Sequence, residues 1–133
     1  MLVGKAIYEL LVSDATVESL VQEKIFPNVA AQTTEFPFIV YDVTSDDPED
    51  TKDGVSTLDS NTVMVSGYAQ TYSKASSLAV AIRDALDRAS GIQEGVVIQT
   101  IQYKGYNDVF DDMSGSDGIY RKSLDFKVRI INT

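Results

Sequence analysis

Apolar residues in the first part of the chain recur every three or four positions, which is the spacing of a helix with one buried face. This N-terminal stripe consists of Leu2, Val3, Ala6, Ile7, Leu10 and Leu11. Ser13 or Asp14 interrupts the pattern and can act as the N-cap of a second, short helix. The buried face of that second helix would consist of Val17, Leu20 and Val21.

A third and longer helix is predicted after residue 72, because apolar residues again recur at helical spacing. Its stripe consists of Ala75, Leu78, Ala79, Ile82, Ala85, Leu86 and Ala89. Ser73 is the expected N-cap, since a serine hydroxyl accepts from free backbone N–H groups. Gly91 is the expected C-cap, since glycine tolerates a left-handed backbone.

Runs of β-branched and aromatic residues predict strands elsewhere in the chain. They cover residues 25–27, 36–43, 58–69, 96–103 and 119–131. The first run is expected at a sheet edge, because its proline cannot donate to a ladder. The second run is apolar on both faces, which predicts an interior strand covered on each side.

Alternation along the two later strands assigns their faces. In the run 96–103, residues 96, 98 and 100 would oppose residues 97, 99 and 101. The apolar face of the last strand consists of Tyr120, Leu124, Phe126, Val128 and Ile130. Its charged face consists of Arg121, Ser123, Asp125, Lys127 and Arg129. Such regular alternation is typical of a sheet with one buried face and one face open to solvent or a partner.

The order of two helices, three strands, one helix and two strands predicts an α+β fold. We expect a mixed or antiparallel sheet of about four to five strands, with one long helix and the N-terminal helices packed on one face. Two polar, acidic stretches, residues 45–57 and 104–118, are predicted to be loops. At 133 residues the chain is most simply a single domain over residues 1–133.

The chain contains neither cysteine nor histidine. Disulfides, thiolate zinc sites and histidine-dependent catalytic triads are therefore excluded. No apolar run is long enough to span a membrane, and the start of the chain does not resemble a signal peptide. We expect no membrane association, and folding in the cytoplasm or in a particle assembled there.

Neither acidic stretch fits a calcium-binding EF-hand loop. With Gly54 at the sixth loop position the twelfth is Ser60, and with Gly118 there the first is Met113. The turn that ends at Gly118 is not a phosphate-binding loop either, because no lysine follows it directly. The sequence therefore assigns no catalytic, cofactor-binding or metal-ligating residue.

Charge is unevenly spread along this chain of net charge −9. Residues 42–53 hold six carboxylates against one lysine, whereas residues 119–133 hold four cations against one carboxylate. The two regions could be complementary surfaces for self-association; the simpler interpretation is a solvated loop and a solvated strand face. The candidate interface residues are Asp46, Asp47, Glu49, Asp50, Asp111, Asp112, Arg121, Lys127 and Arg129.

A string of landmarks occurs at set spacings between residues 25 and 126. They are Ile25-Phe26-Pro27, Phe36-Pro37-Phe38-Ile39-Val40-Tyr41, Leu58-Asp59 leading into Val63-Met64-Val65, Tyr68-Ala69-Gln70-Thr71-Tyr72 at the entry to the long predicted helix, and Gly118-Ile119-Tyr120-Arg121-Lys122-Ser123-Leu124-Asp125-Phe126. This layout resembles the small tail-completion proteins of long-tailed bacteriophages, the tail terminator or tail-to-head joining family.

The resemblance implies a structural virion protein without enzymatic activity or cofactor, assembled in the host cytoplasm. Related terminators cap the head-proximal end of the tail tube, usually as a hexameric ring. They stop tube polymerisation and meet the tube protein on one side and the head–tail connector on the other. The acidic balance would suit a channel through which DNA slides without specific binding, because like charges repel.

Three alternatives stay open at this point. A head–tail connector stopper or adaptor is also a small ring-forming protein, and the sequence separates it poorly from a terminator. A small acidic module that binds a metal or a protein partner belongs to another class. A hydrolase that uses paired carboxylates is a third, because it needs no histidine.

Overall fold

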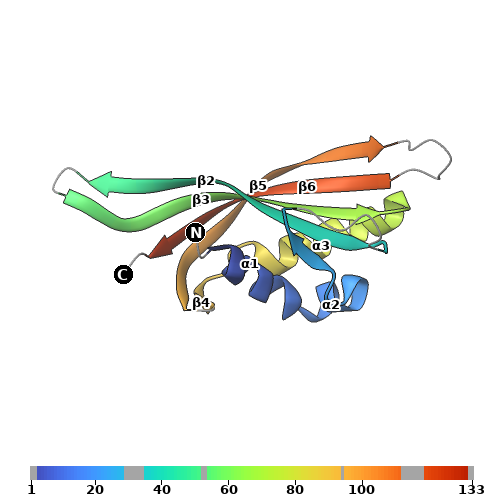
Figure 1. The fold of residues 1–133 in the computed structure, drawn as a ribbon, viewed down its shortest axis with the longest axis horizontal. Coiled ribbons are helices and arrows are strands. Elements are labelled where there is room, and N and C mark those ends of the chain that lie inside the picture. The colour runs from blue at the N-terminus through green and yellow to red at the C-terminus, as the bar shows by residue number, and fades with distance from the viewer. Residues whose placement is uncertain (1–2, 29–34, 52–53, 94, 112–118, 132–133) are drawn as a thin grey trace.

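In the part of the chain that the structure describes, three helices cover one face of a strongly twisted six-stranded sheet (Figure 1). This computed structural model describes residues 3–28, 35–51, 54–93, 95–111 and 119–131. The α+β class is confirmed, but the sheet has six strands rather than four to five. In the described part of the chain, no helix is long and apolar enough to cross a membrane.

The helices and strands follow one another in the predicted order, with one short strand added. They are α1 (Val3–Val12), α2 (Ala15–Val21), β1 (Ile25–Pro27), β2 (Phe38–Thr51), β3 (Gly54–Ala69), α3 (Tyr72–Leu86), β4 (Gly91–Gln93), β5 (Val96–Asp111) and β6 (Ile119–Ile131). The sequence missed β4, because three residues are too few to show a periodic pattern.

The strand order across the sheet is β1-β2-β3-β6-β5-β4. Only the β1–β2 pair among these is parallel, so the sheet is mixed. Strand β1 lies at one edge, as its proline predicts, and β2 lies inside. Residues 38–41 of β2 are buried on both faces, which confirms the prediction made from their apolar pattern.

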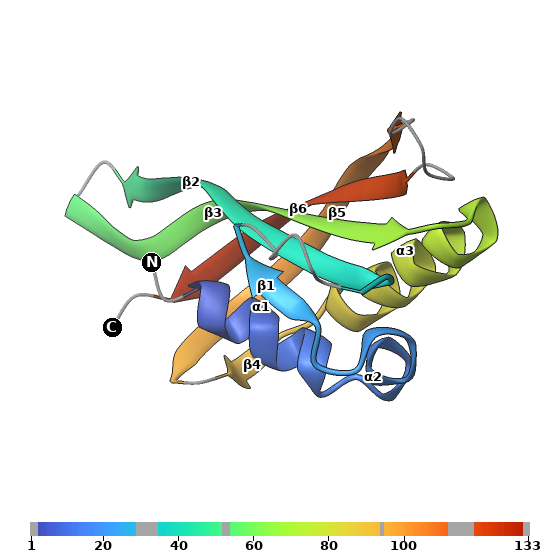
Figure 2. The same ribbon diagram turned by 45° about the vertical axis from the view of Figure 1, so that its right-hand side comes forward.

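The core lies between the helices and the helix-facing side of β3 and β6. Phe126 and Val63 are fully buried there, together with Leu78 and Ile82 of α3. The open face of the sheet, opposite the helices, carries the alternate residues of the same strands (Figure 2). In β6 this open face carries the charged residues that the alternation assigned to it, and they are only partly buried except for the buried Ser123.

Helix α3 packs unusually close to β3 at Gly67. A Cβ atom added at Gly67 would lie 2.8 Å from Leu78 Cδ2 and 2.9 Å from Leu78 Cγ. Real Cβ atoms do not come this close to other carbon atoms. The absence of a side chain at this position therefore sets the distance between α3 and the sheet.

Helix capping agrees with the sequence for α2 but not for α3. Asp14 caps α2, because its Oδ1 accepts the N–H groups of Thr16 and Val17, each at 3.0 Å. The N-cap of α3 is Thr71 instead of Ser73, since the Thr71 hydroxyl accepts the Lys74 N–H at 3.2 Å.

The end of α3 also differs from the prediction. The helix stops at Leu86, with Asp87 as its C-cap. Arg88 supplies a left-handed residue at φ 64°, and Gly91, at φ 113°, belongs to β4. The predicted C-cap at Gly91 is therefore wrong, because a non-glycine residue makes the turn.

The two acidic stretches predicted as loops are largely strand. Residues 45–51 and 54–57 form the outer part of the β2–β3 hairpin, and residues 104–111 extend β5. Polar residues can form such ribbons because backbone hydrogen bonds join the strands without a buried face. Pro48 fits in β2 because, among the described residues, β1 pairs with residues 39–41 of β2 and not with the part of the strand that contains Pro48.

Two irregularities in β5 change which side chains share a face. The register shifts between Ile98 and Thr100, and again between Tyr103 and Gly105. An extra residue reverses the alternation, so Ile98 and Ile101 are both buried on the helix side. The simple alternation predicted for residues 96–101 is therefore wrong at this bulge.

Replacing Gly67 with alanine should destabilise the fold by about 1–3 kcal/mol, because the added methyl overpacks the contact with Leu78. Urea unfolding measures the change. Gly4→Ala is the matched control, since its Cβ would meet Tyr41 Cε2 at an ordinary 3.6 Å. An equal effect of the two substitutions would contradict the close packing at Gly67.

Candidate assembly interface

The acidic candidate residues Asp46, Asp47, Glu49 and Asp50 lie in the outer part of β2. Their backbone pairs with β3, and the register opposes Asp47 to Ser60. Asp111 lies at the far end of β5, opposite Ile119. Asp112 lies outside the described residues.

The basic candidates lie along β6, on the open face of the sheet. Register pairs Asp47 with Ser60 and Ser60 with Arg129, so this acidic position and this basic position share one row of the sheet. Lys127 lies two residues further along β6, opposite Thr62. The structure therefore brings the acidic stretch and the end of the basic strand together within one chain.

Arg121 lies at the other end of β6, between Tyr68 and Val109. Its Nε atom is buried and has no hydrogen-bond partner. Eight residues of strand separate it from Arg129, which corresponds to about 26 Å. The basic candidates thus do not form one patch.

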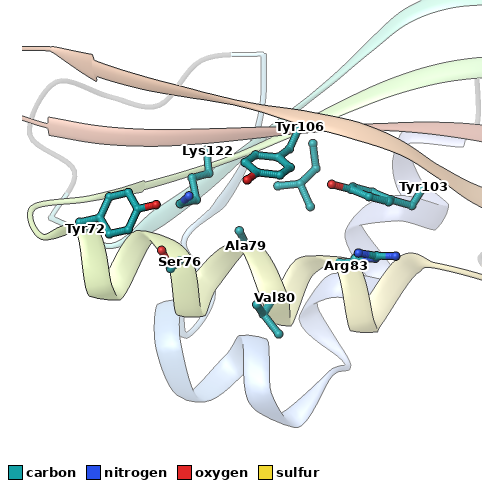
Figure 3. Close-up of a pocket in the computed structure, with 9 residues that line it drawn as sticks. Tyr72, Ser76, Ala79, Val80, Arg83, Tyr103, Tyr106 and Lys122 are labelled. Atoms are coloured by element: carbon teal, nitrogen blue, oxygen red, sulfur yellow. The ribbon is translucent and has the colours of Figure 1, made fainter.

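A groove that the sequence did not reveal runs between α3 and the strands β5 and β6 (Figure 3). Its volume is about 290 Å³. Figure 3 shows Tyr72 and Lys122 at one end and Tyr103 above Arg83 at the other. The floor between them is apolar and includes Ala79.

Lys122 is a buried cation on the helix-facing side of β6, with 6% of its surface exposed. Its Nζ donates to Asp108 Oδ1 at 2.7 Å and lies 4.6 Å from the centre of the Tyr72 ring. It also lies 5.2 Å from the centre of the Tyr106 ring. The two rings and the carboxylate replace the water that the ammonium loses.

Burial alone would lower the pKa of Lys122. The hydrogen bond and the negative charge of Asp108, together with Tyr72, outweigh this effect and hold the pKa above its ordinary value. The ammonium is therefore charged at neutral pH, and it ties the outer part of β5 to β6.

The other end of the groove is held by polar contacts between α3 and β5. The guanidinium of Arg83 lies 4.1 Å from the centre of the Tyr103 ring and 3.8 Å from Asp87 Oδ2. Asp87 Oδ1 accepts the Tyr103 N–H at 3.2 Å, and the Arg88 N–H donates to the Ile101 carbonyl at 2.8 Å. A second hollow, of about 520 Å³, continues from here and is lined by Arg83, Arg88 and Lys104.

Large apolar side chains remain exposed around the groove. Tyr72, Val80 and Tyr106 are 56%, 60% and 57% exposed, and Phe110 beyond them is 50% exposed. Scattered exposed apolar residues are ordinary, but a cluster that borders a groove is typical of a protein-binding surface.

Part of this site carries a signal in the sequence. Lys122 lies on the same face of β6 as the apolar residues Tyr120, Leu124 and Phe126. A lysine on a buried face needs a partner for its charge, because an unpaired buried charge is costly. Its partner Asp108 could not be placed, because residues 104–118 were predicted to be a loop. The bulge at Gly105, with φ 128°, turns both Tyr103 and Tyr106 toward the groove, and no local pattern encodes that.

The groove along α3 and the exposed rings around it offer features of a protein-binding surface. Within the ranges that the structure describes, no group of three or more acidic side chains is placed to hold a metal ion. A groove that offers rings, an apolar floor and paired charges suits the docking of another chain. Such surfaces on a small α+β sheet are typical of structural proteins that work in assemblies.

Comparison with known proteins identifies the family of this chain. Residues 5–131 match the family described as Tail completion protein gp17, so the chain belongs to that family. The fold is similar to that of a chain in the virion of a native gene transfer agent particle, with a TM-score of 0.73 and 18% identity. That match covers 96% of this chain and 92% of the other. No curated protein matches the sequence significantly.

The chain is therefore a structural tail protein of bacteriophage type. The resemblance drawn from the sequence landmarks is confirmed at the level of the family. Membership of this family and the likeness to a virion chain support association with other tail proteins.

Asp108→Ala should destabilise the protein more than Lys122→Met. Loss of the carboxylate leaves a buried ammonium without its acceptor, at a cost of about 1–3 kcal/mol. Methionine instead removes the buried charge and keeps an apolar stem, so its cost should stay below about 1 kcal/mol. Urea unfolding at neutral pH compares the two variants. A larger loss for Lys122→Met would contradict this account of the pair.

The pH dependence of the same pair has a defined sign. Because folding raises the pKa of Lys122, its contribution is fully present below the ordinary value of 10.5 and is lost as pH rises through the folded-state pKa. The gap in unfolding free energy between the native chain and Asp108→Ala should therefore be constant at neutral and mildly alkaline pH. It should shrink in strongly alkaline solution. A gap that already closes near neutral pH would contradict the raised pKa.

Proposed function

We propose that this chain is the subunit of a ring that caps the head-proximal end of the tail tube, ends tube polymerisation and helps to join tail to head. The observation that carries the proposal is membership of a tail-completion family over residues 5–131. The similarity of the fold to a chain in the virion of a gene transfer agent particle also supports a role in a virion. The proposal includes no enzymatic activity, and it treats residues 1–133 as one working domain.

The physical argument for a ring starts from its contacts. A closed ring of identical subunits needs two different surfaces that fit each other, because each contact is head-to-tail. This chain offers surfaces of different character: an acidic hairpin end, a basic strand and a groove with exposed rings. In this proposal the ring is a hexamer, and it meets the tail tube protein on one side and the connector on the other.

The charged candidates take a role within this proposal. Asp46, Asp47, Glu49 and Asp50, with Asp111 and Asp112, would line the lumen or a contact between subunits. Arg121, Lys127 and Arg129 would serve contacts on the open face of the sheet. A net charge of −9 suits a channel for DNA, since a polyanion slides past a like-charged wall without binding it.

Disruption of this gene in the parental phage, followed by electron microscopy of the particles, tests the role. We expect filled heads beside unattached tails of uncontrolled length, because tubes without their cap keep polymerising. Separate tails of normal length would instead assign the chain to the connector as a stopper or adaptor. Normal infectious virions would contradict both roles. Expression of the native chain from a plasmid is the control, and it should restore joined particles.

A further inference from the structure

The outer end of the β2–β3 hairpin and the start of helix α3 lie in different parts of the molecule (Figure 1). We propose that this groove receives the end of the β2–β3 hairpin of a second copy of the chain. The arm is defined here as residues 45–51 and 54–57. The docking groove is the continuous hollow between α3 and β5. This inference rests on the proposed ring and names the contact that would close it.

The docking groove has an apolar end and a basic end. The apolar hollow and the polar hollow share Arg83 and Tyr103, so they form one path along α3. At the apolar end the rings of Tyr72 and Tyr106 are more than half exposed. At the basic end, three cations face one carboxylate: Arg83, Arg88 and Lys104 against Asp87.

The arm has the opposite charge. The β2 half of the arm carries Asp46, Asp47, Glu49 and Asp50 without a cation. Among the described residues, β6 pairs with β3 from Leu58 onward, so residues 54–57 of the arm extend beyond the described end of β6 by about 13 Å as part of a two-stranded ribbon. Asp46, Asp47 and Glu49 lie at the base of this ribbon, opposite Asn61, Ser60 and Leu58. Such a ribbon is long enough to reach into a neighbouring molecule.

The apolar end of the docking groove also has a counterpart in the arm. The β3 half of the arm contains Val55, so the arm is not polar throughout. An acidic ribbon with apolar positions matches a groove that is basic at one end and lined with exposed rings at the other. Charge complementarity of this kind also fixes the orientation of a contact.

The positions of arm and docking groove suit a ring. In Figure 1 the arm forms the left end of the molecule, and α3 begins at the right end; Figure 2 shows the same separation. Each copy can therefore give its arm to one neighbour and receive the arm of another, which is the head-to-tail contact that a closed ring requires. The basic end of β6 is a less suitable binding site for the arm of a neighbour, because Arg129 already lies in the same row of the sheet as Asp47 of its own arm.

Crosslinking tests the contact directly, because the native chain contains no cysteine. The variant that combines Glu49→Cys in the arm with Lys104→Cys in the docking groove is incorporated into tails and treated with a short bismaleimide. We expect a ladder of covalent oligomers. The matched control combines Glu49→Cys with Glu18→Cys, an exposed position of α2 that does not line the docking groove, and should give monomer. Equal yields of oligomer from both pairs, or none from the first, would overturn the proposal.

Charge reversal provides an independent test in the same tails. Variant A carries Asp46→Lys, Asp47→Lys and Glu49→Lys; variant B carries Arg88→Glu and Lys104→Glu. Each alone should lower the yield of capped tails about tenfold or more, since like charges would then face each other. A mixture of A and B should restore capping, because every arm then meets a groove of opposite charge in an alternating ring.

The outcomes separate this contact from the proposed function. If the native chain caps tails but A or B caps them equally well, the ring stands and the arm contact is wrong. If A and B both fail and the mixture fails as well, while both fold as judged by circular dichroism, the arm or the docking groove binds another tail protein and the proposal is overturned. If the native chain does not cap tails, the proposed function itself fails.

Discussion

The pairing of β3 with β6 is the interaction on which the rest of the structure depends. The two strands run antiparallel from Leu58 to Ala69 and from Ile131 to Tyr120 without an interruption in register. One side of this pair forms the floor of the core, and α3 can approach it closely because Gly67 has no side chain. The same pair carries β2 on one side and β5 on the other, so its twist sets the direction of both hairpins.

The docking groove follows from how β5 joins this central pair. Lys122 and Asp108 tie the outer half of β5 to β6, while Asp87 and Arg88 tie its inner half to the end of α3. Between these two attachments, α3 and β5 do not close over each other, and exposed rings remain. The ion pair between buried Lys122 and partly exposed Asp108, together with the end of α3, thus leaves a groove open in the surface.

Local patterns in the sequence predicted much of this fold. The stripe in α3 and the alternation in β6 are strong because apolar residues repeat over many positions. Strand β6 and the body of α3 were therefore predicted correctly, although both ends of α3 were not. The prediction that the acidic stretches are loops was wrong, since a polar stretch such as residues 45–51 has no alternation of apolar residues that would indicate a strand. Among the candidate residues, the strand register places Asp47 and Arg129 in one row of the sheet and Arg121 far from both. Neither arrangement could be predicted from the spacing of these residues in the sequence.

By itself the sequence determined the α+β class, the order of the long elements, which side of β6 is buried and, through its landmarks, the tail-completion family. The fold class, the order of the elements and the buried side of β6 can be predicted because each follows from a periodic pattern of apolar residues within one segment. Only the tertiary structure decided the strand order, the bulges of β5 and the groove along α3. Each of these depends on partners far apart in the chain. The bulge before Gly105 is the clearest case, because one extra residue places Tyr103 and Tyr106 on the same face, and its position is set by pairing with β6.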